Sequence, residues 1–272
     1  MRRFVALSTR QTPTTSSASK IQRWLRGQGV EIGAFLYPIK RERTIFVDKF
    51  REFAGQQVLA DYYGEASALP FYDSSLDYVV ASHVIEHVAN PVKALLEWYR
   101  VLKSGGVIYM VVPDRRYTFD HNREVTSLEH LWDDYRGKTT DCDSTHIDEF
   151  VDNVDFALFE PTIPEAARAE RRLHIKADCW AAIRNRQEIN IHFHVFEPQS
   201  MRDLLLKIGK ECEIRWQIVD FAERYPEDRL DGFLFVIQIL KERRFLRENL
   251  KRAVQRWGSN TYPLTESAVA MK

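Results

Sequence analysis

The stretch from residue 76 to residue 114 constrains the fold more than any other part of the chain. Its first and last runs, LDYVVAS and VIYMVVPD, are almost continuously apolar, as strands are when both faces of a sheet are covered. Between them, NPVKALLEWYRVLKSGG repeats apolar residues at helical spacing, with Asn90 as the expected N-cap and Gly105 as the expected end of the helix. A strand, a helix and a strand joined by short links predict parallel strands connected by a right-handed crossover.

Two short strands are expected before this unit, at residues 29–34 and 44–49. The connection between them contains Pro38 and is too short for a full helix. After the unit, a helix at residues 198–210 is followed by strands at 212–222 and 232–242. The gap between the last two strands permits a hairpin but not a crossover, so they should be antiparallel. The predicted fold is a doubly wound, mostly parallel α/β sheet with an antiparallel last hairpin.

The predicted organisation is one domain, residues 20–258, with flexible polar tails at residues 1–19 and 259–272. Residues 114–197 fit no simple sheet element. They leave the carboxyl end of a strand, where α/β sheets bind ligands, so we expect a helical lid that recognises the acceptor. A helical packing layer without substrate contact is the alternative. The insertion holds six of the eight histidines: His121, His130, His146, His174, His192 and His194.

Charge and cysteine content exclude several classes of protein. Basic and acidic residues number 39 each, so no overall basic field favours a nucleic-acid partner. No apolar run approaches the roughly 18 residues of a membrane span, and no signal peptide is expected at the N-terminus. Three widely spaced cysteines without a Cys-x-x-Cys pair predict free thiols in a reducing compartment, hence a cytoplasmic protein. The sequence leaves a monomer and a homodimer open.

Several motifs, in this order, resemble the class I S-adenosylmethionine-dependent methyltransferases. VEIGA at residues 30–34 is similar to the family's first motif, FVDK carries Asp48 where the second strand of the family ends in an acidic residue, and residues 64–114 are similar to the central block. The chain departs from the usual G-x-G of the first motif. The resemblance, over about residues 22–242, implies a seven-stranded Rossmann-like methyltransferase sheet and S-adenosyl-L-methionine as cofactor. The EIGA-type first motif resembles a bacterial subset that is often associated with surface sugars.

The chemistry of this cofactor gives each expected binding residue a role. One carboxylate best accepts the two ribose hydroxyls, so Asp48 is the expected ribose ligand. Gly33 allows close backbone approach. Glu31 orients the loop, receives the cofactor's amino group through water, or accepts backbone N–H groups. The resemblance implies that Glu65 and Ala66 face the adenine. The expected cofactor-binding residues are Glu31, Gly33, Ala34, Asp48, Glu65, Ala66, Ser82 and His83.

Residues 82–91, SHVIEHVANP, raise an alternative, because H-x-x-E-H is a pattern of zinc hydrolases. A zinc helix would need these residues to be helical, but the run follows one predicted strand directly and precedes the helix capped by Asn90. We therefore expect a loop or a single turn. Ser82 and His83 should line the cofactor pocket, and Glu86 with His87 should brace the loop by hydrogen bonds.

Methyl transfer to a hydroxyl needs orientation above all, but it also benefits from a base, for which histidine is suited near neutral pH. The candidate catalytic residues are His83, His146 and His194. His192 shares an alternating segment with His194, so the two form a catalytic or metal-binding pair or one solvated face. We expect no metal site; a divalent ion held by Asp114, His146 and Asp148 is the less favoured alternative.

The sequence thus predicts a methyltransferase that uses S-adenosyl-L-methionine. The predicted reaction is O-methylation of a small polar acceptor such as a sugar or glycoconjugate. N-methylation of another natural-product scaffold and a catalytically silent cofactor-binding protein are the alternatives.

Overall fold

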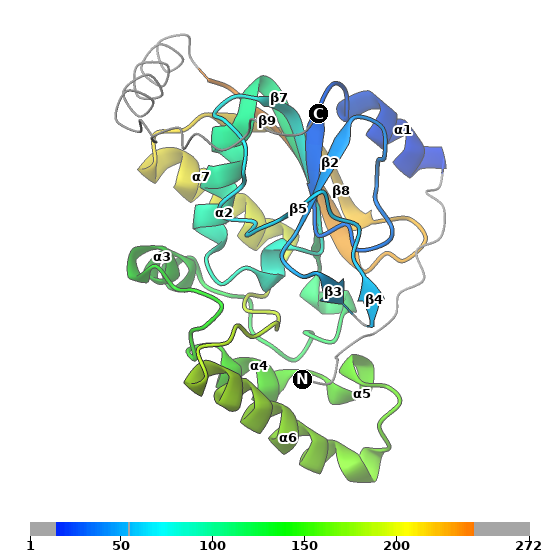
Figure 1. Ribbon diagram of the computed structural model, residues 1–272, viewed down its shortest axis with the longest axis vertical. Coiled ribbons are helices and arrows are strands. Elements are labelled where there is room, and N and C mark those ends of the chain that lie inside the picture. Colours follow the sequence, from blue (N-terminus) through cyan, green and yellow to red (C-terminus); the bar gives the residue numbers. More distant parts are fainter. Residues whose placement is uncertain (1–14, 54, 242–272) are drawn as a thin grey trace, which may run out of the picture. The chain divides into compact units, whose positions relative to one another are not determined.

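The computed structural model describes residues 15–53 and 55–241, and the unit discussed here ends at Leu240. Seven strands form one sheet in the order β5-β2-β1-β6-β7-β9-β8 (Figure 1). The first five are parallel, and β9 is antiparallel to both β7 and β8, which confirms the predicted sheet and its last hairpin. The sheet strands are β1 (Gly29–Ile32), β2 (Thr44–Asp48), β5 (Tyr62–Tyr63), β6 (Leu76–Ser82), β7 (Leu102–Pro113), β8 (Trp216–Tyr225) and β9 (Gly232–Ile239).

The central strand–helix–strand unit forms largely as its sequence predicts. Helix α2 (Pro91–Val101) begins with Asn90 as N-cap, whose side chain accepts a hydrogen bond from the Lys93 amide at 3.0 Å. The helix ends four residues earlier than Gly105, because Leu102 is already extended and starts β7. Gly105 has a positive φ of 87°, as expected of a helix-ending residue, but it lies within β7.

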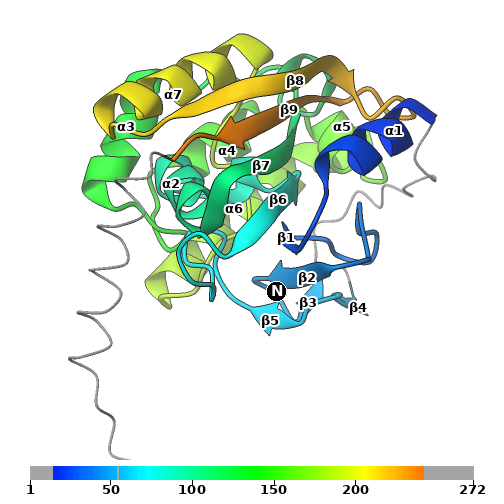
Figure 2. The same ribbon diagram turned by 90° about the horizontal axis from the view of Figure 1, so that it is seen from above.

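Helices cover both faces of the sheet, as the two-sided burial of the strands requires (Figure 2). On one face, α2 and α7 (Pro198–Glu211) pack against the sheet through residues such as Trp98 and Leu204. On the other face, Leu25, which directly follows α1 (Thr15–Trp24), packs against Tyr78 and Tyr109.

Helix α1 corrects the expected N-terminal tail. It begins at Thr15, so the expectation of a flexible segment through residue 19 is wrong for its last five residues. Lys20 and Trp24 both bind the Asp220 carboxylate, at 2.7 and 2.8 Å, which anchors α1 to β8. Residues 1–14 and 242–272, with the expected C-terminal tail, lie outside the described residues.

The connection from β1 to β2 contains no helix, as its length predicts. Its shape depends on the buried Glu31 carboxylate, which accepts hydrogen bonds from the amides of Ile39 at 2.8 Å and Lys40 at 3.3 Å. A short hairpin, β3 (Glu52–Phe53) and β4 (Gln56–Gln57), follows β2.

The insertion between β7 and α7 is helical, as predicted, and lies beyond the carboxyl ends of the strands (Figure 1). The Arg115 amide donates to the Phe196 carbonyl at 3.1 Å, which joins the two ends of the insertion. One part has its own apolar core around Phe150 and Phe193, whereas Trp132 packs into the main core. The insertion contains η2 (Arg115–Tyr117), α3 (Leu128–Gly137), α4 (Ile147–Asn153), α5 (Phe156–Phe159) and α6 (Glu165–Arg184).

The thiols and the helices agree with two further expectations. Cys142, Cys179 and Cys212 are all free. Across residues 15–53 and 55–241, none of the helices combines the length and the apolar character needed to cross a bilayer.

Candidate active site

Three of the expected cofactor positions lie side by side at the carboxyl edge of the sheet. Ile32 pairs with Val47 on one side and with Ala81 on the other. Gly33, Asp48 and Ser82 are the next residues of these three strands. The structure therefore brings together the positions that were expected to face one ligand, while their role in binding stays a prediction.

Gly33 occupies a position that only glycine fits. Its φ is +65°, and an added Cβ would lie 2.9 Å from the Val84 side chain. The adjoining Ala34 is buried. The chain thus keeps a bare backbone at the point where β1 meets the edge, as close approach by a ligand requires.

Asp48 presents a largely buried carboxylate at the same edge. Its Oδ1 accepts a hydrogen bond from the Phe50 amide at 2.9 Å. Burial raises the pKa of Asp48 above its ordinary value, although the amides of Phe50, Lys49 and Phe35 act in the opposite direction. A carboxylate that has lost much of its hydration gains most from new hydroxyl donors, so Asp48 suits the ribose.

Of the roles foreseen for Glu31, the structure shows the backbone acceptor, through the amides of Ile39 and Lys40. Glu65, expected near the adenine, pairs with Lys49 at 3.2 Å. Burial raises the pKa of Glu65 and the Lys49 charge partly offsets it. The Ala66 carbonyl accepts from the Trp98 indole at 2.9 Å, which fixes this backbone against α2.

Lys49 connects the sheet edge to the insertion. Its ammonium group binds Asp141 and lies 3.0 Å from Glu188, both residues of the insertion, as well as contacting Glu65 on the sheet side. Burial alone would lower the pKa of Lys49, but these carboxylates raise it above its ordinary value. The insertion is thereby held next to Asp48, which supports its interpretation as a lid.

The H-x-x-E-H segment does not form a zinc helix. Strand β6 runs through Ser82, and only the single 3₁₀ turn η1 (Ile85–His87) follows before α2. The expectation that the Glu86 side chain braces the loop is wrong, since within the described chain neither carboxylate oxygen has a hydrogen-bond partner. The Glu86 carbonyl does this instead, by accepting from the Phe193 amide at 2.8 Å.

The Glu86 carboxylate is buried among histidines. Its Oε1 lies 3.8 Å from His83 Nδ1 and 3.9 Å from His87 Nε2. Burial raises the pKa of Glu86 to about 7 and lowers the pKa of His87 to about 3. His192 lies against His87 and is oriented by Asp120, whose Oδ2 is 2.6 Å from His192 Nδ1.

The three candidate catalytic histidines fall into two groups. His83 follows Ser82 with a left-handed backbone, φ 55°, and its Nε2 lies 2.8 Å from a guanidinium nitrogen of Arg229. His146 and His194 instead contact each other and Asp134.

The sequence analysis did not identify Asp134 as a site residue, and it assigned His130 only to the insertion. The two residues lie one turn apart on α3. Their i, i+4 spacing on one helix face was the available signal.

The less favoured metal set is not assembled. Asp114 binds Arg116 at 2.6 Å, and Asp148 lies 3.1 Å from Lys176. His146, the third member, belongs to the group around Asp134.

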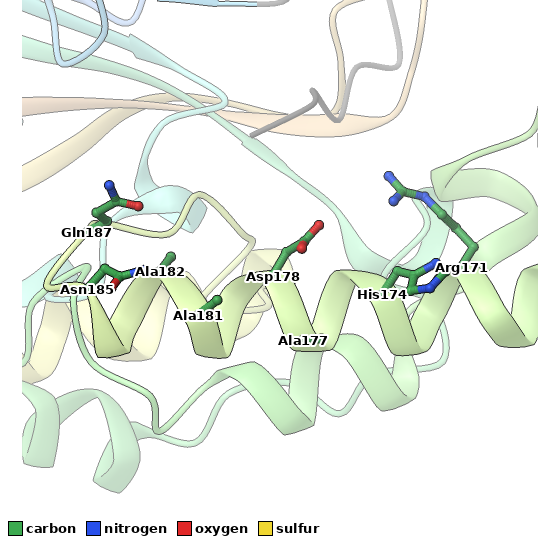
Figure 3. A pocket seen from close by; sticks show the side chains of 8 residues that line it. All are labelled: Arg171, His174, Ala177, Asp178, Ala181, Ala182, Asn185 and Gln187. Carbon is green, nitrogen blue, oxygen red and sulfur yellow. The ribbon is translucent and has the colours of Figure 1, made fainter.

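A hollow of about 510 Å³ lies elsewhere, along α6 (Figure 3). Arg171, His174 and Asp178 line it, and none of Gly33, Asp48 or Ser82 does. It is open to solvent along one helix, so we place the chemistry at the sheet edge instead.

Comparison with known proteins agrees with this geometry. Residues 44–110 match the family model described as a methyltransferase domain, a stretch that runs from β2 to the middle of β7 and includes Asp48, Ser82 and His83. This stretch of the chain is therefore similar to a methyltransferase domain, and S-adenosyl-L-methionine is the cofactor that the class I resemblance implies.

The chain is also similar, over part of its length, to several named proteins. A Mycolicibacterium smegmatis protein named a probable S-adenosylmethionine-dependent methyltransferase is 35% identical over 104 residues, 36% of this chain and 40% of the relative. The demethylmenaquinone methyltransferase of Renibacterium salmoninarum is 51% identical over 43 residues, 16% of this chain and 18% of the relative. The chain spans less than half the length of the curated relatives it matches.

Solved methyltransferase structures are also similar to this one. A SAM-dependent methyltransferase from Methanosarcina mazei is 17% identical, covers 82% of this chain and 98% of its own, and has a TM-score of 0.44.

Proposed function

We propose that the protein transfers the methyl group of S-adenosyl-L-methionine to a hydroxyl group of a small polar acceptor. The observation that carries this proposal is the register that sets Gly33, Asp48 and Ser82 side by side at the sheet edge. Asp48 and Ser82 also lie within the stretch that matches a methyltransferase domain. When bound, the cofactor supplies a methyl group activated by a sulfonium. Asp48 would accept the ribose hydroxyls, and Gly33 would leave room for close approach.

His83 is the residue that we propose to take the acceptor's proton. An arginine only donates hydrogen bonds, so His83 Nε2 next to Arg229 carries a lone pair. To give its proton to this nitrogen, the acceptor hydroxyl would take the place of the Arg229 guanidinium. The left-handed backbone of His83 is a strained conformation of the kind that clusters at functional sites. Glu86, 3.8 Å from the other ring nitrogen, is placed to stabilise the imidazolium that results.

A sugar or glycoconjugate is the acceptor that we propose. The resemblance of the EIGA segment to methyltransferases associated with surface sugars supports it, as does the partly exposed Arg116 held by Asp114 just beyond β7. A planar guanidinium fixed by a carboxylate suits the polar groups of such an acceptor. We also propose a cytoplasmic location, since free cysteines suit a reducing compartment.

Calorimetry with S-adenosylmethionine and S-adenosylhomocysteine tests the cofactor site. Asp48→Ala should weaken binding by about 1–3 kcal/mol, or roughly 5–150-fold, through loss of charge-assisted hydrogen bonds. Asp133→Ala, a change at an exposed residue of α3, serves as the matched control and should leave affinity unchanged. Unchanged affinity in Asp48→Ala would show that the ribose site is misplaced. No binding to the wild-type protein would reject the methyltransferase proposal.

Labelled methyl transfer to a panel of sugars, nucleotide sugars and amines tests the reaction. We expect turnover on hydroxyl acceptors, and His83→Gln should lower kcat by about 10²–10⁴-fold. This kcat is measured at saturating cofactor, because His83 also lines the expected cofactor pocket. Methylation of amines alone would replace the O-directed proposal with N-methylation. Cofactor binding without turnover on any acceptor would favour a silent binding protein.

A further inference from the structure

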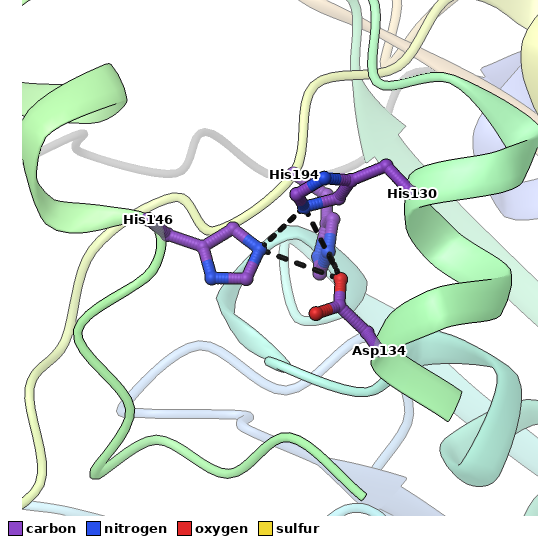
Figure 4. A group of neighbouring side chains, drawn as sticks. All are labelled: His130, Asp134, His146 and His194. Carbon is purple, nitrogen blue, oxygen red and sulfur yellow. Dashed lines mark hydrogen bonds and ion pairs between the residues drawn. The ribbon is translucent and has the colours of Figure 1, made fainter. Parts of the chain in front are cut away.

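Four side chains from three separate segments point at one spot inside the insertion (Figure 4). His130 and Asp134 come from α3, His146 precedes α4, and His194 belongs to the extended segment before α7. Asp134 Oδ2 lies 2.9 Å from His194 Nε2, 3.3 Å from His130 Nε2 and 3.4 Å from His146 Nε2. The Nε2 atoms of His130 and His146 are 2.8 Å apart.

The hydrogen bonds around this cluster leave lone pairs facing each other. His194 Nδ1 lies 3.2 Å from the Val88 carbonyl, which can only accept, so Nδ1 carries the proton. The Nε2 of a neutral His194 then holds a lone pair, and it faces the Asp134 carboxylate. His146, His194 and Asp134 are all buried, so water does not relieve this contact. A cation bound between these atoms turns the repulsion into attraction.

We propose that His130, Asp134, His146 and His194 bind one zinc ion. Tetrahedral zinc with bonds of about 2.0–2.1 Å holds its ligand atoms about 3.3 Å apart. Four of the six separations between the ligand atoms are 2.8 to 3.4 Å, which is close to that spacing. Three imidazole nitrogens and one carboxylate oxygen favour zinc over magnesium and calcium, which prefer oxygen ligands.

Further contacts orient the ligands as second-layer groups do in zinc proteins. The Val88 carbonyl holds His194, the Thr145 hydroxyl lies 3.0 Å from His146 Nδ1, and Asn90 donates to the Asp134 carbonyl at 3.0 Å. Val88 and Asn90 belong to the loop that carries His83 and Glu86. The zinc ligands are therefore fixed against the same loop that forms the candidate active site.

Four protein ligands make a closed site, which is typical of structural zinc. Its place in the fold fits that role, because α3 packs into the main core while α4 and Phe193 belong to the separate core of the insertion. The ion would join these two cores beside the active-site loop. His146 and His194 would then be metal ligands rather than bases.

Metal analysis of the full-length chain without an added histidine tag tests this proposal. After zinc loading and dialysis we expect one equivalent of zinc per chain in the wild-type protein. His130→Gln should lose the ion yet keep the fold, because the His130 side chain is 45% exposed, and Asp134→Asn should lose it as well. His174→Ala, a histidine on the outer face of α6, and Glu86→Gln should retain it.

Cobalt replacement gives a second readout, with visible bands typical of tetrahedral coordination and an X-ray absorption shell of nitrogen and oxygen with imidazole scattering. Wild-type protein that takes up no zinc, or His130→Gln and Asp134→Asn that both keep a full equivalent, would overturn the site. Loss in Glu86→Gln alone would move the ion to Glu86, His87 and His192 and equally refute this assignment. None of these measurements uses the cofactor or the acceptor, so their outcome is separate from that of the proposed function.

Discussion

The parallel sheet buries continuous apolar strands, whereas the insertion buries charged and titratable groups around a smaller apolar core. Val79 and Val80 of β6 are completely buried. In the insertion, Arg123 is equally buried, but it is ion-paired with Asp120 and Glu149. The free energy gained by burying apolar surface does not depend on the direction of individual contacts. A buried charge, in contrast, is stable only while each of its hydrogen-bond and ion-pair partners stays in place.

Because of this difference, we expect mutations to destabilise the sheet and the insertion in different ways. The sheet should lose stability in proportion to the apolar volume removed from it. The insertion should loosen as a unit when one of its polar contacts is broken, because the remaining partner is left buried and unpaired.

The largest expected effect is on the free energy of unfolding, and it distinguishes the main core from the core of the insertion. Trp98→Ala removes a fully buried ring between α2 and the sheet and should lower the free energy of unfolding by about 3–5 kcal/mol. Phe150→Ala empties a comparable site in the insertion core. We expect its effect to be local, with lost amide-exchange protection in α4 and α6 but not in β6 and β7.

Hydrogen exchange of both variants, read by mass spectrometry, checks this expectation. Equal loss of protection in the strands and in the insertion helices after Phe150→Ala would show that the two cores unfold as one.

A smaller effect concerns the sheet edge and pH. Because burial raises the pKa of Asp48 and ribose hydroxyls favour its ionised form, cofactor binding should lower that pKa. Affinity is then highest above the pKa of the free protein. It should fall as pH falls through that value, by at most about tenfold per pH unit. Calorimetry from about pH 8 down to about pH 4, the ordinary pKa of an aspartate, measures the affinity.

Asp48→Asn is the matched control, since an amide does not titrate in this range. Its affinity should be weak at all pH values, and an equal pH dependence in Asp48→Asn would assign the titration to another group.

The smallest effect tests the contact between the regions at Asn90. Asn90→Ala removes both the cap of α2 and the donor to the Asp134 carbonyl, and should cost about 0.5–2 kcal/mol. Asn90→Ser keeps a capping oxygen and loses the amide donor to α3 without adding a charge. Thermal or denaturant unfolding compares the two variants. A cost in Asn90→Ser as large as in Asn90→Ala would place the stabilisation in the link to α3 rather than in the cap.

The sheet could be predicted because each strand and helix depends on a short, continuous pattern in the sequence. The apolar run of residues 76–82 predicts β6 to the residue, and the spacing after Asn90 predicts the start of α2. Gly33 and Asp48 could be placed at one edge because parallel strands end on the same side.

The histidine cluster was not predictable in the same way. His130 and His194 lie far apart in the sequence, and only the path of the insertion brings them together. The end of α2 was also missed, because strand pairing of Leu102 with Leu76 overrides the helical spacing.

The position of Lys49 has a consequence for turnover. This lysine is adjacent to Asp48 and is bound to carboxylates of both the sheet side and the insertion. In the proposed function, a cofactor leaving Asp48 lies next to this cluster of opposite charges, which joins the insertion to the sheet edge. Dissolved ions weaken such attractions, so product release should quicken as ionic strength rises.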